Sequence, residues 1–183
     1  RGFFCAEYPV TFSQYLEYVN ELQERDPALA KQRAPQLRGS DGMLAKIGED
    51  GRWVPDEILI EGSARDRYPE GQGFEAHIPV VGVSYNDVLA YIAWRSKRDG
   101  VEYRLMTSDE WEKAARGTDG RLFPWGDSFD ATFCKMRFSR EELSQLEPVG
   151  VFEKDVSPYG VRDMAGGVQE WCAHDGHEKD SDR

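Results

Sequence analysis

Residues 107–117 read TSDEWEKAARG and contain the start, the body and the end of one helix. Thr107 and Glu110 form a capping box, in which each side chain accepts a hydrogen bond from the backbone N–H of the other residue. Trp111 and the two alanines that follow it recur at helical spacing and supply an apolar face. Gly117 stands where a left-handed glycine usually ends a helix. The pattern predicts an amphipathic helix between the threonine and the first residues before the glycine.

Two earlier segments have the same layout. Ser84 begins one of them, in which apolar side chains recur at helical spacing until Gly100 ends the run. Thr11 begins the other, which predicts a helix over residues 12–23, and a proline after a capping aspartate predicts a short helix over 28–32. These segments contain the strong helical signals of the chain.

Strand signals are short and scattered. They are found at Trp53-Val54, at residues 58–60 and at residues 103–105. Residues 117–183 are rich in Gly, Asp, Pro and aromatic residues without a helical period, which indicates tight turns and short strands. Neither an internal repeat nor an interdomain linker is evident, so we expect one α+β domain over residues 1–183.

Composition narrows the class of protein. Apolar residues make up 39% of the 183 residues, which with 18 glycines is ordinary for a globular protein. The net charge of −11 would repel the phosphate backbone, so we do not expect a nucleic-acid partner. No window approaches the roughly 18 uninterrupted apolar residues of a membrane span, and the start lacks the layout of a signal peptide. Three widely spaced cysteines favour a reducing compartment, and we expect a cytoplasmic protein without a membrane partner.

Residues 163–170 read DMAGGVQE and offer a candidate metal site. Asp163 and Glu170 flank a glycine-containing turn whose main-chain carbonyls could converge with the two carboxylates on one ion. Ligation by oxygen atoms only is what Ca²⁺ prefers. The same residues also fit a turn capped by Asp163 and an ion pair between Glu170 and an arginine, and the spacing does not distinguish these interpretations.

Two histidines near the end of the chain offer a second metal pattern. His174 and His177 are three residues apart among acidic residues, a spacing at which imidazoles can share a transition metal. No further histidine or cysteine completes the set, and polar chain ends usually lie in solvent. We therefore favour a solvated terminus.

Six blocks along the chain together resemble the formylglycine-generating enzyme (sulfatase-modifying factor) family. They occur in the order of that family and span nearly the whole chain, which makes the match more specific than any one motif. The blocks are YPVT at 8–11, PVVGVS at 79–84, YRL at 103–105, EWEKAARG at 110–117, PWG at 124–126 and GGVQEW at 166–171.

The resemblance implies a fold and a metal site. The fold would be a compact variant of the C-type lectin fold, with two main helices, short twisted strands and much irregular structure. The structural calcium of the family would be bound by the side chain of Asp163, the main-chain carbonyls of Gly166 and Val168, and the carboxylate of Glu170. A second calcium site of the family is not expected, because residues 133–136 read FCKM, and a thiol or a lysine is a poor calcium ligand.

The tryptophans of the blocks are expected to be structural. Trp111, Trp125 and Trp171 each offer a large apolar surface with one N–H group. A domain with few long elements can build its core from such side chains, so we expect core packing for all three.

The catalytic cysteines of the family are not matched in this chain. Catalytic members oxidise a sulfatase cysteine to formylglycine with molecular oxygen and a copper ion held by two cysteines, which follow an Arg-Gly-Gly-Ser block. Cys5, Cys134 and Cys172 do not stand at those positions, and the chain reaches Arg183 before such a block. Gly167 also departs from the family, whose members usually have asparagine there. No catalytic residue and no copper ligand is therefore carried over.

The polar insertion before Pro79 and residues 129–139 resemble most the noncatalytic versions of the domain attached to bacterial Ser/Thr kinases. The resemblance thus implies a noncatalytic binding or sensing domain that is stabilised by calcium. Its ligand would be a protein or a small molecule, and the domain would be a module of a larger bacterial protein such as a kinase. We expect it to lack the C-terminal part of the family's fold. The alternative is a copper-dependent formylglycine-generating oxygenase whose cysteine pair lies beyond Arg183.

Overall fold

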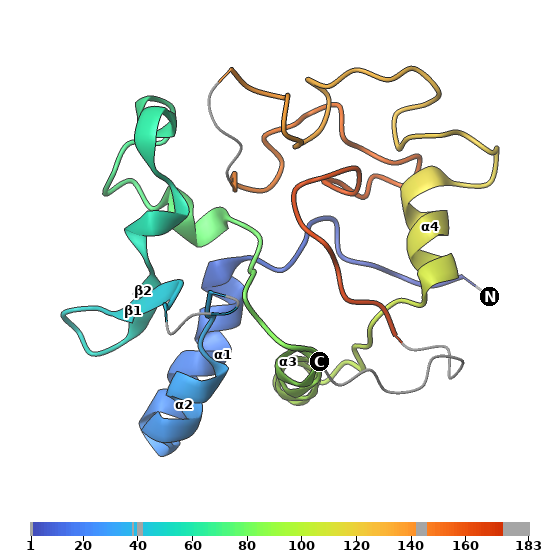
Figure 1. The fold of residues 1–183 in the computed structure, drawn as a ribbon. Helices are drawn as coiled ribbons and strands as arrows, with labels where there is room; N and C mark the ends of the chain where they lie inside the picture. The colour runs from blue at the N-terminus through green and yellow to red at the C-terminus, as the bar shows by residue number, and fades with distance from the viewer. Residues whose placement is uncertain (1, 38, 40–41, 142–145, 174–183) are drawn as a thin grey trace.

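The computed structural model describes residues 2–37, 39, 42–141 and 146–173, and the chain is α+β (Figure 1). The described part contains four α-helices, three short 3₁₀ helices and one antiparallel two-stranded sheet. The α-helices are α1 (Phe12–Arg25), α2 (Pro27–Arg33), α3 (Tyr85–Asp99) and α4 (Ser108–Arg116); the strands are β1 (Ala45–Ile47) and β2 (Trp53–Pro55); the 3₁₀ helices are η1 (Glu57–Leu59), η2 (Gly62–Asp66) and η3 (Phe74–His77).

Local capping explains where the long helices begin and end. Thr11, Ser84 and Thr107 each accept a hydrogen bond from the backbone N–H of the third helical residue, whose side chain accepts one in return. Gly100 and Gly117 follow α3 and α4 with φ angles of 67° and 74°, which glycine adopts without steric cost. The helices predicted from the capping patterns are therefore confirmed.

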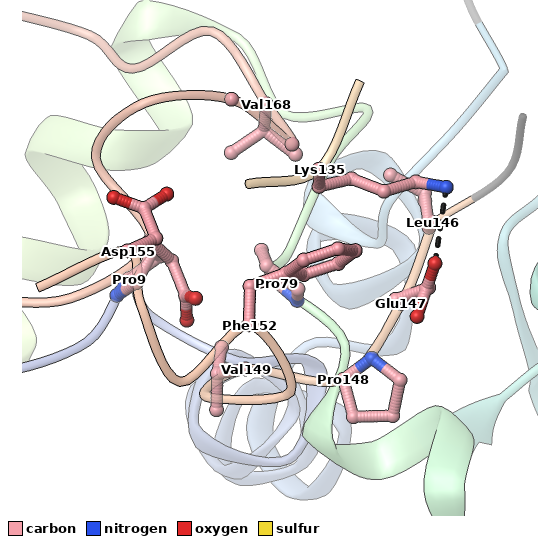
Figure 2. Close-up of a pocket in the computed structure, with 13 residues that line it drawn as sticks. Pro9, Pro79, Lys135, Leu146, Glu147, Pro148, Val149, Phe152, Asp155 and Val168 are labelled. Carbon is pink, nitrogen blue, oxygen red and sulfur yellow. Dashed lines mark hydrogen bonds and ion pairs between the residues drawn. The ribbon is translucent and has the colours of Figure 1, made fainter. Parts of the chain in front are cut away.

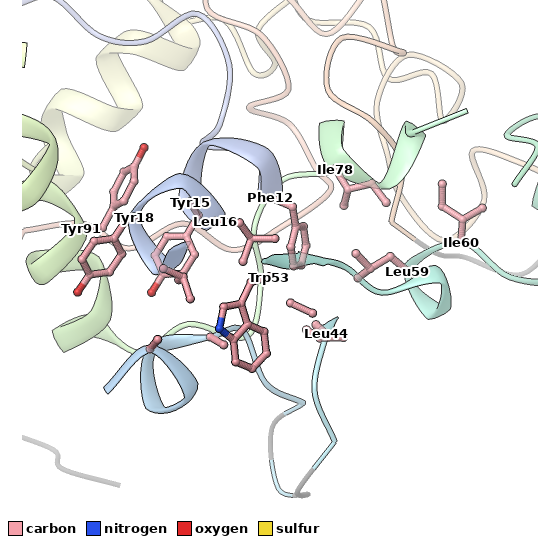
Figure 3. Close-up of a cluster of buried hydrophobic side chains, with 14 of the residues drawn as sticks. Phe12, Tyr15, Leu16, Tyr18, Leu44, Trp53, Leu59, Ile60, Ile78 and Tyr91 are labelled. Carbon is pink, nitrogen blue, oxygen red and sulfur yellow. The ribbon is translucent and has the colours of Figure 1, made fainter. Parts of the chain in front are cut away.

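The main core surrounds α1 (Figure 3). Phe12, Tyr15 and Val19 are at most 1% exposed and follow one face of that helix. Ile60 and Ile78 are fully buried and pack on the same face from segments later in the chain. Burial of this apolar surface is the main force that holds the helices and the small sheet together.

A polar clamp fixes the sheet to α1. The side-chain amide of Asn20 donates to the carbonyl of Trp53 at 3.0 Å and accepts from the N–H of Trp53 at 2.7 Å. Asn20 is only 7% exposed, so these two bonds satisfy polar groups that would otherwise be buried without partners.

Two predicted strands are absent from the structure. Ile58 and Leu59 lie in η1, because the side chain of Asp56 accepts the N–H of Ile58 at 3.0 Å and starts a 3₁₀ turn. Residues 103–105 form no strand, because the N–H of Tyr103 donates to the Ser96 hydroxyl instead of to a neighbouring strand. In both places a hydrogen bond to a nearby side chain takes the place of the backbone hydrogen bonds that would pair two strands.

A second, smaller core joins α4 to the loop-rich region, which consists of residues 117–141 and 146–173 and lies away from α1 and α2 in Figure 1. Its buried members are Ala114, Ala115, Val161 and Met164, with Trp111 packed against them. The backbone around residue 164 is thereby held against the helix.

The expectation that all three tryptophans pack in a core is wrong for Trp125 and for Trp171. The side chain of Trp171 is 51% exposed; one edge contacts Tyr85 and the indole N–H donates to the carbonyl of Val83. Residue 171 lies where the chain leaves the second core, so only part of the ring finds partners. Trp125 is half-buried and stacks on Phe123 outside both cores.

Within the described residues, no helix combines the length and the apolar character that crossing a bilayer requires.

Candidate functional site

Asp163, the first residue of the candidate metal segment, is held in an unusual conformation. Its φ angle is 60°, in the left-handed region that residues with a side chain seldom adopt. The backbone N–H of Asp163 donates to the carbonyl of Asp155 at 3.1 Å, and its Oδ2 accepts the N–H of Gly150 at 2.7 Å. These bonds fix both the backbone and the side chain of Asp163.

The turn that follows is pressed against the backbone of Lys135. A Cβ atom on Gly166 would lie 2.0 Å from the carbonyl oxygen of Lys135, so only glycine fits at this position. Gly167 donates to that same oxygen at 2.9 Å, and the N–H of Val168 donates to the carbonyl of Gly166 at 3.0 Å. The main chain of the candidate site is therefore tightly constrained.

The structure also explains the departure at Gly167. Its φ angle is 80°, a conformation that glycine adopts freely and that asparagine tolerates better than most residues. Glycine therefore fits the backbone conformation found at this position.

Glu170, the last predicted ligand, contacts α4. Its Oε2 accepts the indole N–H of Trp111, and no ion pair between Glu170 and an arginine is found among the described residues. The residue as a whole is exposed, yet protein atoms crowd its carboxylate, and the lost hydration raises its pKa. The bond from Trp111 lowers that pKa, and the charge of Asp163 raises it.

A third carboxylate, which the sequence did not single out, is hydrogen-bonded to the candidate segment. Asp155 is 1% exposed, and its side chain accepts the N–H of Ala165 at 3.0 Å. Burial raises the pKa of Asp155 to about 6; the bond from Ala165 lowers it, and the charges of Asp163 and Glu170 raise it further. Loss of hydration also raises the pKa of Asp163. A bound cation would stabilise the ionised form of all three carboxylates.

Asp155 and Asp163 line a small cavity with the backbone of residues 166–168 (Figure 2). Its free volume is about 20 Å³, enough for about one water-sized species. Figure 2 shows Asp155 on one side and the ion pair of Lys135 with Glu147 on the other, with an Nζ–O distance of 3.2 Å. Lys135, which was not expected to bind calcium, therefore forms an ion pair with the buried carboxylate of Glu147.

The chemistry of the predicted donors fits calcium. Asp163 and Glu170 each use one carboxylate oxygen in the bonds described above and retain a second, and a carbonyl oxygen has two lone pairs. Among the described residues no group of three or more His, Cys, Asp or Glu side chains is arranged to hold a metal ion. An ion here would therefore need main-chain carbonyls, such as those of Gly166 and Val168, to complete its shell. The calcium site remains a prediction.

The histidines and cysteines considered as candidate ligands add nothing to the candidate metal site in the described residues. His174 and His177 lie outside the described residues. Cys134 is 2% exposed, and burial raises the pKa of its thiol to about 11. Cys5 is exposed, and its pKa is also raised, by partial desolvation and then by the charge of Glu170.

Residues 1–181 match the sulfatase-modifying factor enzyme 1-like domain, the FGE-sulfatase family. The chain belongs to this family. One relative, inactive C-alpha-formylglycine-generating enzyme 2 of Bos taurus, is 36% identical over 96% of the chain and 60% of that protein. The formylglycine-generating enzyme of Mus musculus is 32% identical over 94% of the chain and 49% of that protein. The serine/threonine-protein kinase pkn1 of Chlamydia pneumoniae is 36% identical over 94% of the chain and 22% of that protein.

The resemblance inferred from the six blocks is thus confirmed, including the kinase-attached versions of the domain. The chain spans less than two thirds of the length of each of these relatives.

Proposed function

We propose that this FGE-sulfatase domain is a noncatalytic binding or sensing module. The main support is the similarity to an enzyme named inactive over 96% of this chain and to a kinase over 94% of it. This similarity agrees with a role other than oxidation.

The proposal includes a structural calcium ion and a compact variant of the C-type lectin fold. Asp163 and Glu170 would bind the ion through carboxylate oxygens, and Gly166 and Val168 through carbonyls. The ion would neutralise carboxylates whose pKa values are raised by loss of hydration, and it would tie the loop-rich region to α4 through Glu170 and Trp111. Calcium here would stabilise the fold and would take part in no reaction.

The ligand would be a protein or a small molecule, and the domain would work in the cytoplasm, in one chain with a kinase domain. Similarity to pkn1 over 94% of this chain supports that last association. The net charge of −11 argues against a nucleic-acid ligand.

Two measurements test the proposal. The first incubates the protein with Cu(I), oxygen and a cysteine-containing sulfatase peptide, with the mouse formylglycine-generating enzyme as the positive control. We expect no aldehyde from this chain, and copper-dependent aldehyde formation would refute the noncatalytic role.

The second measurement follows the melting temperature with and without added Ca²⁺. We expect calcium to raise it in the wild type but not in Glu170→Ala, because an ion that binds only the folded state stabilises that state. Glu153→Ala, which removes an exposed carboxylate, serves as the control and should respond like the wild type. An unchanged wild-type melting curve would exclude the calcium site.

A further inference from the structure

Asp155 lies outside the predicted calcium segment but is bonded to it at two points. Its carboxylate accepts the N–H of Ala165 at 3.0 Å through Oδ2 and at 3.3 Å through Oδ1. Its backbone carbonyl accepts the N–H of Asp163 at 3.1 Å. Asp155 therefore contacts the turn from Asp163 to Gly166 at its first and third residues.

The bonding of Asp155 differs from that of the other deeply buried carboxylate. Glu147 is bonded to the ammonium of Lys135 at 3.2 Å, the guanidinium of Arg140 at 3.0 Å and the hydroxyl of Tyr68 at 2.8 Å. These partners compensate a buried charge in the way that structural ion pairs do. The bonds to the Asp155 carboxylate come from the backbone of the candidate segment instead.

The bonds of Asp155 help to fix the conformation of the proposed calcium ligands. A left-handed φ angle is energetically unfavourable at a residue with a side chain. The bonds to the Asp155 carbonyl and from Gly150 oppose this cost and fix the Asp163 carboxylate by one oxygen, which leaves the other outside that bond. The bond to Ala165 fixes the backbone immediately before Gly166.

We propose that Asp155 is a positioning residue for calcium, which holds Asp163 and the 164–166 backbone in the ligating arrangement without binding the ion itself. This inference rests on the calcium site proposed above. The buried negative charge of Asp155 also favours a cation nearby, since charges interact strongly where water is excluded. Binding should therefore depend on Asp155 although all of its assigned bonds are to protein.

The test measures the affinity for Tb³⁺ and Ca²⁺ directly. Terbium replaces calcium at oxygen sites, and excitation of Trp111, which is bonded to Glu170, should sensitise its luminescence. Calcium competition then gives the dissociation constant. The variant is Asp155→Asn, which keeps the size and one oxygen acceptor of the side chain but removes its charge. The matched control is Glu75→Gln, which alters a carboxylate that is 8% exposed and paired with Arg65 away from this segment.

We expect Asp155→Asn to weaken calcium binding by about 10- to 100-fold, the range found for groups that orient metal ligands. Glu75→Gln should leave the affinity within about twofold of the wild type even if it lowers the melting temperature, because the lost ion pair does not touch the segment. An unchanged affinity in Asp155→Asn would overturn the positioning role. Equal losses in both variants would also overturn it, because they would reflect general destabilisation.

The two proposals fail in different ways. If the wild type shows neither sensitised terbium emission nor competition by calcium, the calcium site is wrong and the role of Asp155 falls with it. If the wild type binds and Glu170→Ala abolishes binding while Asp155→Asn binds normally, only the role of Asp155 is wrong.

Hydrogen exchange in the wild type provides a test that does not depend on the folding of a variant. Because Asp155 is proposed to order the segment before the ion binds, the N–H of Ala165 should be protected in calcium-free buffer. Rapid exchange of this amide that slows only when calcium is added would show that the ion, and not Asp155, orders the turn.

Discussion

Gly166→Ala tests the close contact between the candidate segment and the Lys135 backbone. The added Cβ would lie 2.0 Å from the carbonyl oxygen of Lys135 and 2.9 Å from its carbonyl carbon. Real Cβ contacts are essentially never shorter than 3.0 Å, so the two backbones must separate by at least 1.0 Å, the difference between 3.0 and 2.0. That separation would break the 2.9 Å bond from Gly167 to the same oxygen.

The magnitude follows from the overlap. Overpacking by a methyl group in a tightly packed site typically costs about 1–3 kcal/mol. For a domain of this size each kcal/mol lowers the melting temperature by about 2–4 °C. We therefore expect Gly166→Ala to melt about 2–12 °C below the wild type, and to show a smaller stabilisation by calcium because the carbonyl of residue 166 has moved.

Calorimetry on both proteins, with and without calcium, measures these effects, and Gly167→Asn is the matched control. Gly167 is left-handed, and a Cβ there would meet only the Lys135 Cβ, at 3.9 Å, so asparagine should cost less than about 1 kcal/mol. A melting temperature for Gly166→Ala within about 1 °C of the wild type would refute the argument from close approach. An equal loss in both variants would also refute it.

Three further changes test other parts of the fold. Burial raises the pKa of Glu147, but its hydrogen bonds, first the one from Arg140, lower that pKa by more, so the folded-state pKa lies below the unfolded value near 4.5. The ionised Glu147 therefore stabilises the fold above pH 4.5, and this stabilisation is lost as the pH falls through the folded-state pKa. Glu147→Gln should therefore lower the free energy of unfolding by about 3 kcal/mol at neutral pH. On acidification the urea midpoints of the variant and the wild type should approach each other, and a difference that stays constant with pH would contradict the ion-pair assignment. Asn20→Ala should cost about 2–4 kcal/mol in urea unfolding, because it leaves the buried N–H and C=O of Trp53 without partners; a loss under 1 kcal/mol would indicate that water replaces the amide. Thr107→Ala should cost about 1 kcal/mol by removing the cap of α4, and Thr107→Ser should restore most of it.

The helices and the family could be predicted from the sequence. A capping box needs only four consecutive residues, so Thr11, Ser84 and Thr107 marked the helix starts without knowledge of the rest of the fold. The six blocks of residues carried the family in the same way, because their types and order can be read along the chain.

The errors in the prediction arise where a local preference competes with a specific partner. Residues 58–60 have strand-forming side chains, but the bond from Ile58 to Asp56 places η1 there. Trp171 has the size of a core residue, but it lies at the edge of the second core and is 51% exposed. Side-chain type predicts how well a residue packs, and not whether the fold offers it a place to pack.

At the candidate site, too, the sequence determined one part and the tertiary structure determined another. The sequence determined which oxygen donors are available between Asp163 and Glu170. Only the tertiary structure brought Asp155 and Lys135 to that segment, since the described residues between Lys135 and Asp163 (136–141 and 146–162) contain no helix or strand that would carry a periodic pattern. No periodic pattern encodes such contacts, because they depend on the path of irregular loops, and that path is fixed by burial and by hydrogen bonds between segments that are distant in the sequence.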